Sequence, residues 1–212
     1  MIFEAFARTM SKKIIAAALC ISLHPTETPK QNDIEYKCVY HLFDHQSASI
    51  PVHFSNDLKE QVEYCQNKNQ VTPLLAIQAY DKRFNPPKSV GYAFFSIDTK
   101  GGIINKTRYL HLDLLNVDEN YRRKGIATQM TKAGETITQP KDFSLSDGSN
   151  ISNFYEKLGF TVKERWYCPY PFPCMFKKNK GPLPLNPHAQ KFFNTLKSNP
   201  DQEYKIPKEF LS

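Results

Sequence analysis

The sequence predicts an α+β domain in which a mixed, mostly antiparallel sheet packs against helices. Three runs with strand-like composition, residues 72–83, 89–101 and 107–117, are joined by turns rich in Pro and Gly, which is typical of an antiparallel meander. Apolar residues at helical spacing flank the meander, in residues 56–67 and 122–138. A chain of 212 residues with 40% hydrophobic side chains is long enough for one well-buried core.

The first 34 residues form a segment of their own. Lys12 and Lys13 precede the apolar run IIAAALCISL, and the polar stretch HPTETPKQND follows. This layout is typical of a secretory signal and is too short to span a membrane. No small-residue cleavage site follows the run, so a helix that packs on the domain is the alternative reading of residues 1–34.

The domain itself is expected to cover residues 35–180. It begins with a strand at residues 35–43, where β-branched and aromatic residues are dense, and continues with a helix that Asn56 or Asp57 caps. The meander follows. Residues 181–212 are expected to form a Pro-rich tail with one short helix, PHAQKFFNTLK, which either docks on the domain or binds a partner.

The last strand of the meander, residues 107–117, is expected to bury one of its faces. Side chains alternate along a strand, so two sets point in opposite directions. Leu110, Leu112 and Leu114 form one set, and His111, Asp113 and Leu115 form the other. The first set is expected to lie in the core, while the second carries ionisable groups.

A helix is expected to begin near Gly125, because Ile126, Met130 and Ala133 recur at helical spacing. A short strand in residues 141–150 comes next. A short helix closed by a glycine and a last pair of strands around CPYPFPC complete the domain. The order of elements is therefore strands first, then alternating helices and strands.

Charge and cysteine content narrow the class of protein. The net charge is +7 and the pI about 9.1, but the cations are scattered and no aromatic RNA-binding motif is present, which favours a solvated basic surface over nucleic-acid binding. The five cysteines contain no C-x-x-C pair, so neither a zinc ribbon nor a disulfide framework is indicated. Cys168 and Cys174 flank PYPFP and are either a loop disulfide or reduced thiols.

The stretch NVDENYRRKGIATQM carries the clearest functional signal. A strand, a short turn and the start of a helix leave several backbone N–H groups pointing at one spot, which favours anion binding. Gly125 leaves room for a ligand to approach the backbone, and Ala127 keeps the first helical turn slim. Arg122, Arg123 and Lys124 add positive charge. Such a turn fits a pyrophosphate, although it matches neither a Walker A motif nor G-x-G-x-x-G.

The same stretch resembles the signature of the GNAT superfamily of acyl-CoA N-acyltransferases, (Q/R)-x-x-G-x-(G/A). Arg122, Gly125 and Ala127 meet its fixed positions. The segment NFYEKLGF, residues 153–160, is similar to the second motif of the family, and the resemblance covers roughly residues 35–178. It implies the GNAT fold, with a sheet of six to seven strands that is splayed between the fourth and fifth strands and flanked by helices.

The resemblance implies acetyl-CoA as the co-substrate and no metal. The backbone of Leu115, Asn116 and Val117 would pair with the pantetheine arm like an added strand. The residues implied for the pyrophosphate are Arg122, Arg123, Lys124, Gly125, Ile126, Ala127 and Thr128. Asn150 is a further candidate contact, because Gly148 stands where many members have an asparagine.

The resemblance also implies catalytic roles. Tyr155, in the second motif, would protonate the departing CoA thiolate; packing of its ring on the sheet is the alternative. His111 stands at 122 − 11, where histone-acetylating members have a glutamate, and is the candidate general base. Asp113 would orient His111 or stabilise its charge. Deprotonation of the amine through a water chain is the alternative to His111.

These features together predict an N-acetyltransferase that moves an acetyl group from acetyl-CoA to a primary amine by direct attack in a ternary complex. A catalytically silent GNAT-like module that binds acyl-CoA or another protein is the alternative. The acceptor is a small molecule or a protein amine, and no nucleic acid is expected as a partner. We expect a monomer or homodimer without a membrane span, in the cytoplasm or, alternatively, exported through the signal-like N-terminus.

Overall fold

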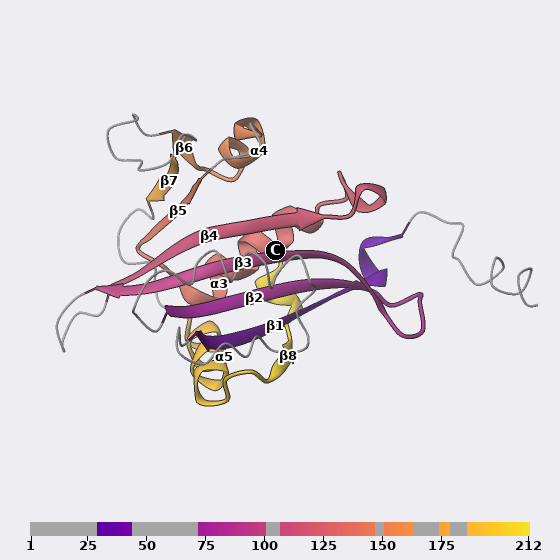
Figure 1. Cartoon of the computed structure of the whole chain (residues 1–212), viewed down its shortest axis with the longest axis horizontal. Helices are drawn as coiled ribbons and strands as arrows, with labels where there is room; N and C mark the ends of the chain where they lie inside the picture. The colour runs from indigo at the N-terminus through magenta and orange to yellow at the C-terminus, as the bar shows by residue number, and fades with distance from the viewer. Residues whose placement is uncertain (1–28, 44–71, 101–106, 147–150, 163–173, 179–185) are drawn as a thin grey trace, which may run out of the picture.

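A computed structural model describes residues 29–43, 72–100, 107–146, 151–162, 174–178 and 186–212 (Figure 1). The described strands are β1 (Ile34–Phe43), β2 (Thr72–Asp81), β3 (Lys88–Lys100), β4 (Thr107–Val117), β5 (Asp142–Ser146), β6 (Thr161–Val162), β7 (Cys174–Lys178) and β8 (Glu203–Lys205). The described helices are α3 (Ile126–Thr138), α4 (Ser152–Lys157) and α5 (Pro187–Ser198), with 3-10 turns η1 (Gln31–Asp33), η2 (Glu119–Tyr121) and η4 (Lys208–Phe210). The helices predicted before residue 34 and at residues 56–67 lie outside these ranges.

The described strands form one sheet in the order β6-β7-β5-β4-β3-β2-β1-β8. Every neighbouring pair is antiparallel except β4 and β5, which run parallel. The predicted class, a mixed and mostly antiparallel sheet with helices, is therefore confirmed. The sheet has eight strands rather than six or seven, because the three-residue β8 of the C-terminal segment adds to the edge of β1.

The sheet is splayed at the junction of β4 and β5. Their parallel pairing covers four positions and ends where Leu112 meets Leu145, one residue before β5 ends. Beyond that point β4 continues for five residues while remaining paired with β3. Figure 1 shows β5, β7 and β6 turning away from β4. The splay lies between the strands where the resemblance placed it.

A β-bulge interrupts the alternation of side chains in β4. Phe94 is in register with Leu114 and Phe95 with Leu112, so Asp113 is the extra residue of the bulge. As a result Leu114 packs with Phe94 on the face away from α3, whereas Leu115 packs against the main core. The predicted faces of these two leucines were wrong, because an extra residue reverses the side on which every later side chain lies.

The main core lies between the sheet and α3. Its largest fully buried side chains include Phe95, Leu75, Ile77 and Met130. A Cβ at Gly134 would come within 2.6 Å of the Phe95 ring, so the glycine lets the helix backbone approach the sheet closely. This packing fixes the position of α3, and with it the turn that precedes the helix.

The C-terminal segment packs on the same domain. Asn186 caps α5 by accepting hydrogen bonds from the N–H groups of His188 and Ala189, at 3.0 and 3.3 Å. Phe193 is buried edge-to-face against Tyr40 of β1, with ring centroids 5.9 Å apart. In Figure 1, α5 and β8 lie beside β1 at one edge of the sheet. The helix predicted in the tail therefore docks on the domain, and within the described residues no helix is long and apolar enough to cross a bilayer.

The described cysteines differ in state. Cys38 is a free, buried thiol, and burial, followed by the nearby charge of Glu203, raises its pKa. Cys174, at the start of β7, is disulfide-bonded to a cysteine outside the described residues. The sequence had left the state of Cys174 open.

Candidate active site

The turn between β4 and α3 has the backbone of an anion site. Arg123 and Gly125 have φ angles of 62° and 79°, in the left-handed region, and α3 begins at the next residue, Ile126. A Cβ at Gly125 would meet no atom within 4 Å. The backbone angle therefore favours glycine, and the space beside Gly125 is open.

The N–H groups at this turn are not used inside the protein. The amide of Gln129 makes the first helical bond, to Gly125 O at 2.9 Å. Gly125 is the N-cap and offers no side-chain acceptor, and the amides of residues 123–128 donate to no other described residue. A helix start with several unused donors favours an anion, since the helix dipole adds positive potential there.

The three cations of the turn have different surroundings. Arg122 Nε donates to Val117 O at 3.1 Å, and Lys124 Nζ donates to Asn120 O at 2.6 Å. Lys124 also lies 5.2 Å from the centroid of the Tyr121 ring. Arg123 is exposed and has no hydrogen-bond partner in the described part of the chain. Arg122 and Lys124 thus brace the turn through backbone oxygens, whereas the exposed Arg123 makes no such bond within the described residues.

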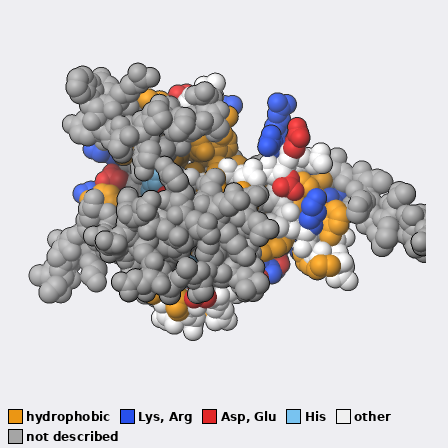
Figure 2. Space-filling model, viewed as in Figure 1, with side chains coloured by type: hydrophobic (Ala, Val, Ile, Leu, Met, Phe, Trp, Pro, Cys, Tyr) orange, Lys and Arg blue, Asp and Glu red, His pale blue; other side chains and the backbone are white. Residues whose placement is uncertain are grey.

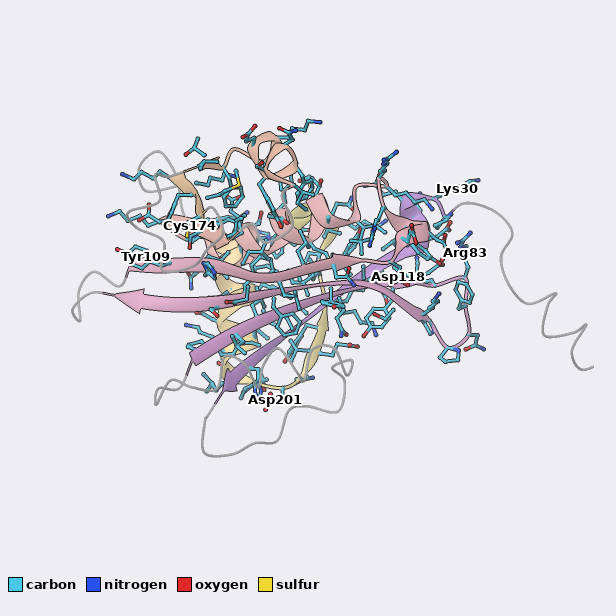
Figure 3. The ribbon with its side chains drawn as sticks, turned by 45° about the horizontal axis from the view of Figure 1, so that its top comes forward. Lys30, Arg83, Tyr109, Asp118, Cys174 and Asp201 are labelled. Carbon is cyan, nitrogen blue, oxygen red and sulfur yellow. The ribbon has the colours of Figure 1, made fainter. Side chains whose placement is uncertain are left out.

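The buried carboxylate of Asp81 holds the turn through Tyr121. Tyr121 Oη donates to Asp81 Oδ2 at 2.9 Å, and Arg83 donates to both oxygens of Asp81, with Nη2 to Oδ2 at 2.6 Å and Nε to Oδ1 at 3.0 Å. Burial opposes ionisation of Asp81, but hydrogen bonds from Arg83 and Tyr121 outweigh it and lower the pKa of Asp81. Figure 3 shows Arg83 and Asp118 at the same end of the sheet.

The end of β4 is the segment that was predicted to meet the pantetheine arm. Leu115, Asn116 and Val117 are in register with β3, and none of the three has a strand partner on the edge towards β5 within the described residues. Ile126 is buried, while Ala127 and Thr128 are half-buried in the first turn of α3. Figure 2 shows charged side chains of both signs projecting where Figure 1 has the end of β4.

A polar group sits at the bulge. His111 Nδ1 lies 2.9 Å from Ser144 Oγ on β5, and Ser96 Oγ on β3 donates to Asp113 Oδ2 at 2.6 Å. Ser96 is also the register partner of His111. The structure thus brings His111 and Asp113 to one face of the sheet, beside the splay, with a serine from each neighbouring strand.

Tyr155 lies on α4 with its ring in the core. Its ring packs edge-to-face against Phe154 and Phe160, with centroids 5.0 and 6.1 Å apart. This packing is the alternative role of Tyr155 named above, and the proposed acid role of its hydroxyl stays a prediction. Asn150 lies outside the described residues. Within the described residues no group of three or more His, Cys, Asp or Glu side chains is arranged to hold a metal ion.

Sequence reasoning missed four polar residues of this region. Asp81 is the last residue of β2 and Arg83 lies two residues beyond it, while Ser96 and Ser144 interrupt apolar strands. Both serines stand out in the sequence as polar residues within FFSID and FSLS. Which side chains they contact, however, depends on the register of the strands. No local pattern pairs residues 40 or 33 positions apart in the chain.

Comparison with known families identifies the chain. The model of the acetyltransferase (GNAT) domain matches residues 55–168, which is more than half of the 212 residues. The chain therefore belongs to the GNAT acetyltransferase family, and acyl transfer is the activity of its class. The match includes the turn, β4, α3 and the polar group at the bulge.

Solved structures of acetyltransferases resemble the chain at low identity. Arabidopsis thaliana Naa50, in complex with a bisubstrate analogue, is 17% identical over 49% of this chain and 72% of its own, with a TM-score of 0.39. The paiA N-acetyltransferase of Thermoplasma acidophilum, in complex with coenzyme A, is 18% identical over 60% of this chain and 81% of its own, with a TM-score of 0.41. A search of curated proteins gave no significant match.

Proposed function

We propose that this protein transfers the acetyl group of acetyl-CoA to a primary amine, by direct attack of the amine within a ternary complex. The observation that carries the proposal is the turn at Gly125, where unused N–H donors and open space lie next to the splayed edge of β4. The pyrophosphate of acetyl-CoA could accept hydrogen bonds from these N–H groups. Its extended pantetheine arm could pair with the edge of β4 beyond the point where the pairing with β5 ends.

The residues at the bulge suit the chemistry at the thioester. The lone pair of the amine attacks the carbonyl carbon, His111 takes a proton from the amine nitrogen, and the C–S bond breaks as the tetrahedral intermediate collapses. Tyr155 then gives its proton to the leaving thiolate. The unperturbed pKa of histidine, about 6.5, suits a base near neutral pH. Asp113, which accepts a hydrogen bond from Ser96, is proposed to orient His111 or to stabilise its charge.

The proposal is tested by measuring acetyl-CoA-dependent release of CoA with a thiol reagent over a panel of amines. The panel contains small polyamines, aminoglycosides, peptides with free N-termini and lysine peptides, since the acceptor is proposed only as a small-molecule or protein amine. The wild-type chain is expected to release CoA with at least one class. Binding of acetyl-CoA in calorimetry with no release over the whole panel would favour the silent acyl-CoA-binding module.

The compartment is a separate proposal. Cytoplasmic placement gives the enzyme direct access to acetyl-CoA, whereas the disulfide at Cys174 and the signal-like start of the chain favour export, because disulfides persist in oxidising compartments. Sequencing the N-terminus of the mature protein distinguishes the two. Cleavage after the apolar run supports export, and an intact Met1 supports the cytoplasm.

A further inference from the structure

Three adjacent strands place a row of polar side chains beside the splay. Ser96 on β3, His111 on β4 and Ser144 on β5 are consecutive register partners, so their side chains lie in one row across the sheet. The flanking residues Leu110 and Leu112 point to the core and are almost fully buried. The row therefore lies on the face away from α3, one position before the pairing of β4 and β5 ends.

The two serines of the row have different partners. Ser96 Oγ donates to the Asp113 carboxylate, whereas Ser144 Oγ lies 2.9 Å from His111 Nδ1 and 3.4 Å from the backbone oxygen of Leu110. A serine hydroxyl has one proton to donate. If that proton goes to Leu110 O, which can only accept, then Ser144 Oγ must accept from His111 Nδ1–H.

This chain of hydrogen bonds decides which ring nitrogen is basic. A neutral imidazole that carries its proton on Nδ1 has its lone pair on Nε2. Nε2 of His111 has no hydrogen-bond partner within the described residues, and His111 is half-buried. The same hydrogen bonds are also compatible with the protonated ring. An imidazolium donates from both nitrogens, and Ser144 Oγ is already positioned to accept from Nδ1–H.

We infer that Ser144 is a positioning residue for the general base. It holds the ring of His111 through Nδ1, donates its own hydrogen bond to Leu110 O and leaves Nε2 to take the proton of the acceptor amine. The inference rests on the proposed function, because it assumes that His111 is the base. In the transfer, the amine proton moves to Nε2, the proton on Nδ1 stays in place, and the hydrogen bond from Nδ1–H to Ser144 Oγ stabilises the positive charge on the ring.

Other ionisable groups lie near His111 in the sheet. The described side chains near it in the ladder are Tyr109 and Asp113 on its own strand, Asp142 on β5 and Lys178 on β7. The Asp142 and Lys178 positions are in register with each other, two positions along from the row. None of these groups is altered by a change at Ser144, so a shift in the titration of His111 in such a variant reports on Ser144.

The inference is tested by the pH dependence of kcat/KM in S144A, S144T and the control S89A, with the acceptor found in the panel. Ser89 is an exposed position of β3 outside the row. S144A is expected to lower kcat/KM by about ten-fold or more and to move the acidic limb to lower pH by about half a unit, because the charged ring loses its acceptor. S144T is expected to restore both, and S89A to match the wild type. An unshifted limb in a folded S144A variant overturns the inference.

A measurement independent of turnover is the tautomer of His111 by ¹⁵N NMR. The wild type is expected to show the proton on Nδ1, and S144A a mixture in which Nε2–H is present. A wild-type ring with its proton on Nε2 overturns the inference. H111Q separates the two proposals, because wild-type activity in H111Q removes His111 as the base, whereas an inactive H111Q with an unchanged S144A removes only the role of Ser144.

Discussion

The conformation of Gly125 links a single residue to ligand binding. With φ at 79°, a residue with a side chain is strained by about 1–2 kcal/mol in this position. A Cβ at this position would meet no atom within 4 Å, so a small side chain would not clash with the rest of the protein. Backbone strain and ligand exclusion can therefore be separated by the size and charge of the substituent.

Gly125→Glu is expected to abolish acetyl-CoA binding, because a carboxylate would occupy the space before the N–H donors and repel the pyrophosphate. Isothermal titration calorimetry measures the effect. Gly125→Ala is the matched control, since it shares the backbone strain but adds no charge, and it is expected to weaken binding by about ten-fold. Equal affinity of Gly125→Glu and the wild type would contradict the pyrophosphate site.

Tyr155→Phe is expected to lower kcat by about ten- to a hundred-fold and to leave the affinity for acetyl-CoA and the unfolding free energy nearly unchanged. The ring packs between Phe154 and Phe160, and phenylalanine preserves that packing while it removes the proton. Steady-state kinetics and urea denaturation measure both quantities. Tyr204→Phe, on β8, is the matched control. Wild-type kcat in Tyr155→Phe would leave the ring with a packing role alone.

At the scale of elements, the turn depends on β2 as well as on β4 and α3. The Asp81 carboxylate at the end of β2 binds Arg83 and Tyr121, and Tyr121 ends the 3-10 turn just before Arg122. Figure 3 shows Lys30, Arg83 and Asp118 at one end of the sheet, and Tyr109 and Cys174 at the other. The turn is thus braced by a strand that is distant from it in the sequence.

Asp81→Asn is expected to lower the unfolding free energy at pH 7 by about 3 kcal/mol, because Arg83 loses the charge that pairs with it in a buried site. The pKa of Asp81 is lowered by folding, so its contribution to stability is present above its unfolded pKa of about 4 and is lost as pH falls through its folded pKa. Urea denaturation between pH 7 and pH 3 is therefore expected to show the two proteins converging at the acidic end.

The control for this prediction is the exposed ion pair of Lys205 with Glu35. Lys205→Ala is expected to change the unfolding free energy by at most about 1 kcal/mol, because solvent screens that pair. A difference between Asp81→Asn and the wild type that stayed constant down to pH 3 would contradict the role of the Asp81 charge.

At the scale of the whole molecule, the C-terminal segment is part of the core. Phe210 of η4 is 1% exposed and packs edge-to-face on Phe192 of α5, with centroids 5.6 Å apart. Ile206 is also buried, and its amide donates to Tyr36 O at 2.9 Å. The segment therefore closes the sheet edge at β1 and packs against α3.

Phe210→Ala is expected to lower the unfolding free energy by about 3–5 kcal/mol, since it removes a fully buried ring and leaves a cavity. Leu42→Ala is the control, because Leu42 is 45% exposed and should cost less than about 1 kcal/mol. Urea denaturation at constant pH measures both. Similar values for the two variants would mean that the C-terminal segment is not required for the stability of the domain.

Much of the fold could be predicted from local sequence. The bounds of β4 and the start of α3 followed from alternation, helical spacing and a glycine at a position that needs a positive φ. β8 could not be predicted, because EYK has too few residues to show a period and forms a strand only by pairing with β1. The bulge at Asp113 was hidden for a similar reason, since it depends on the register with β3.

The sequence by itself determined the family and the candidate turn, because Arg122, Gly125 and Ala127 lie within six residues and form one local motif. Only the tertiary structure decided which groups surround that turn and the bulge. Ser144 meets His111, and Asp81 meets Tyr121, across 33 and 40 positions of the chain. Such contacts are set by strand order and register, which result from burying the whole apolar face of the sheet at once and not from any short stretch of residues.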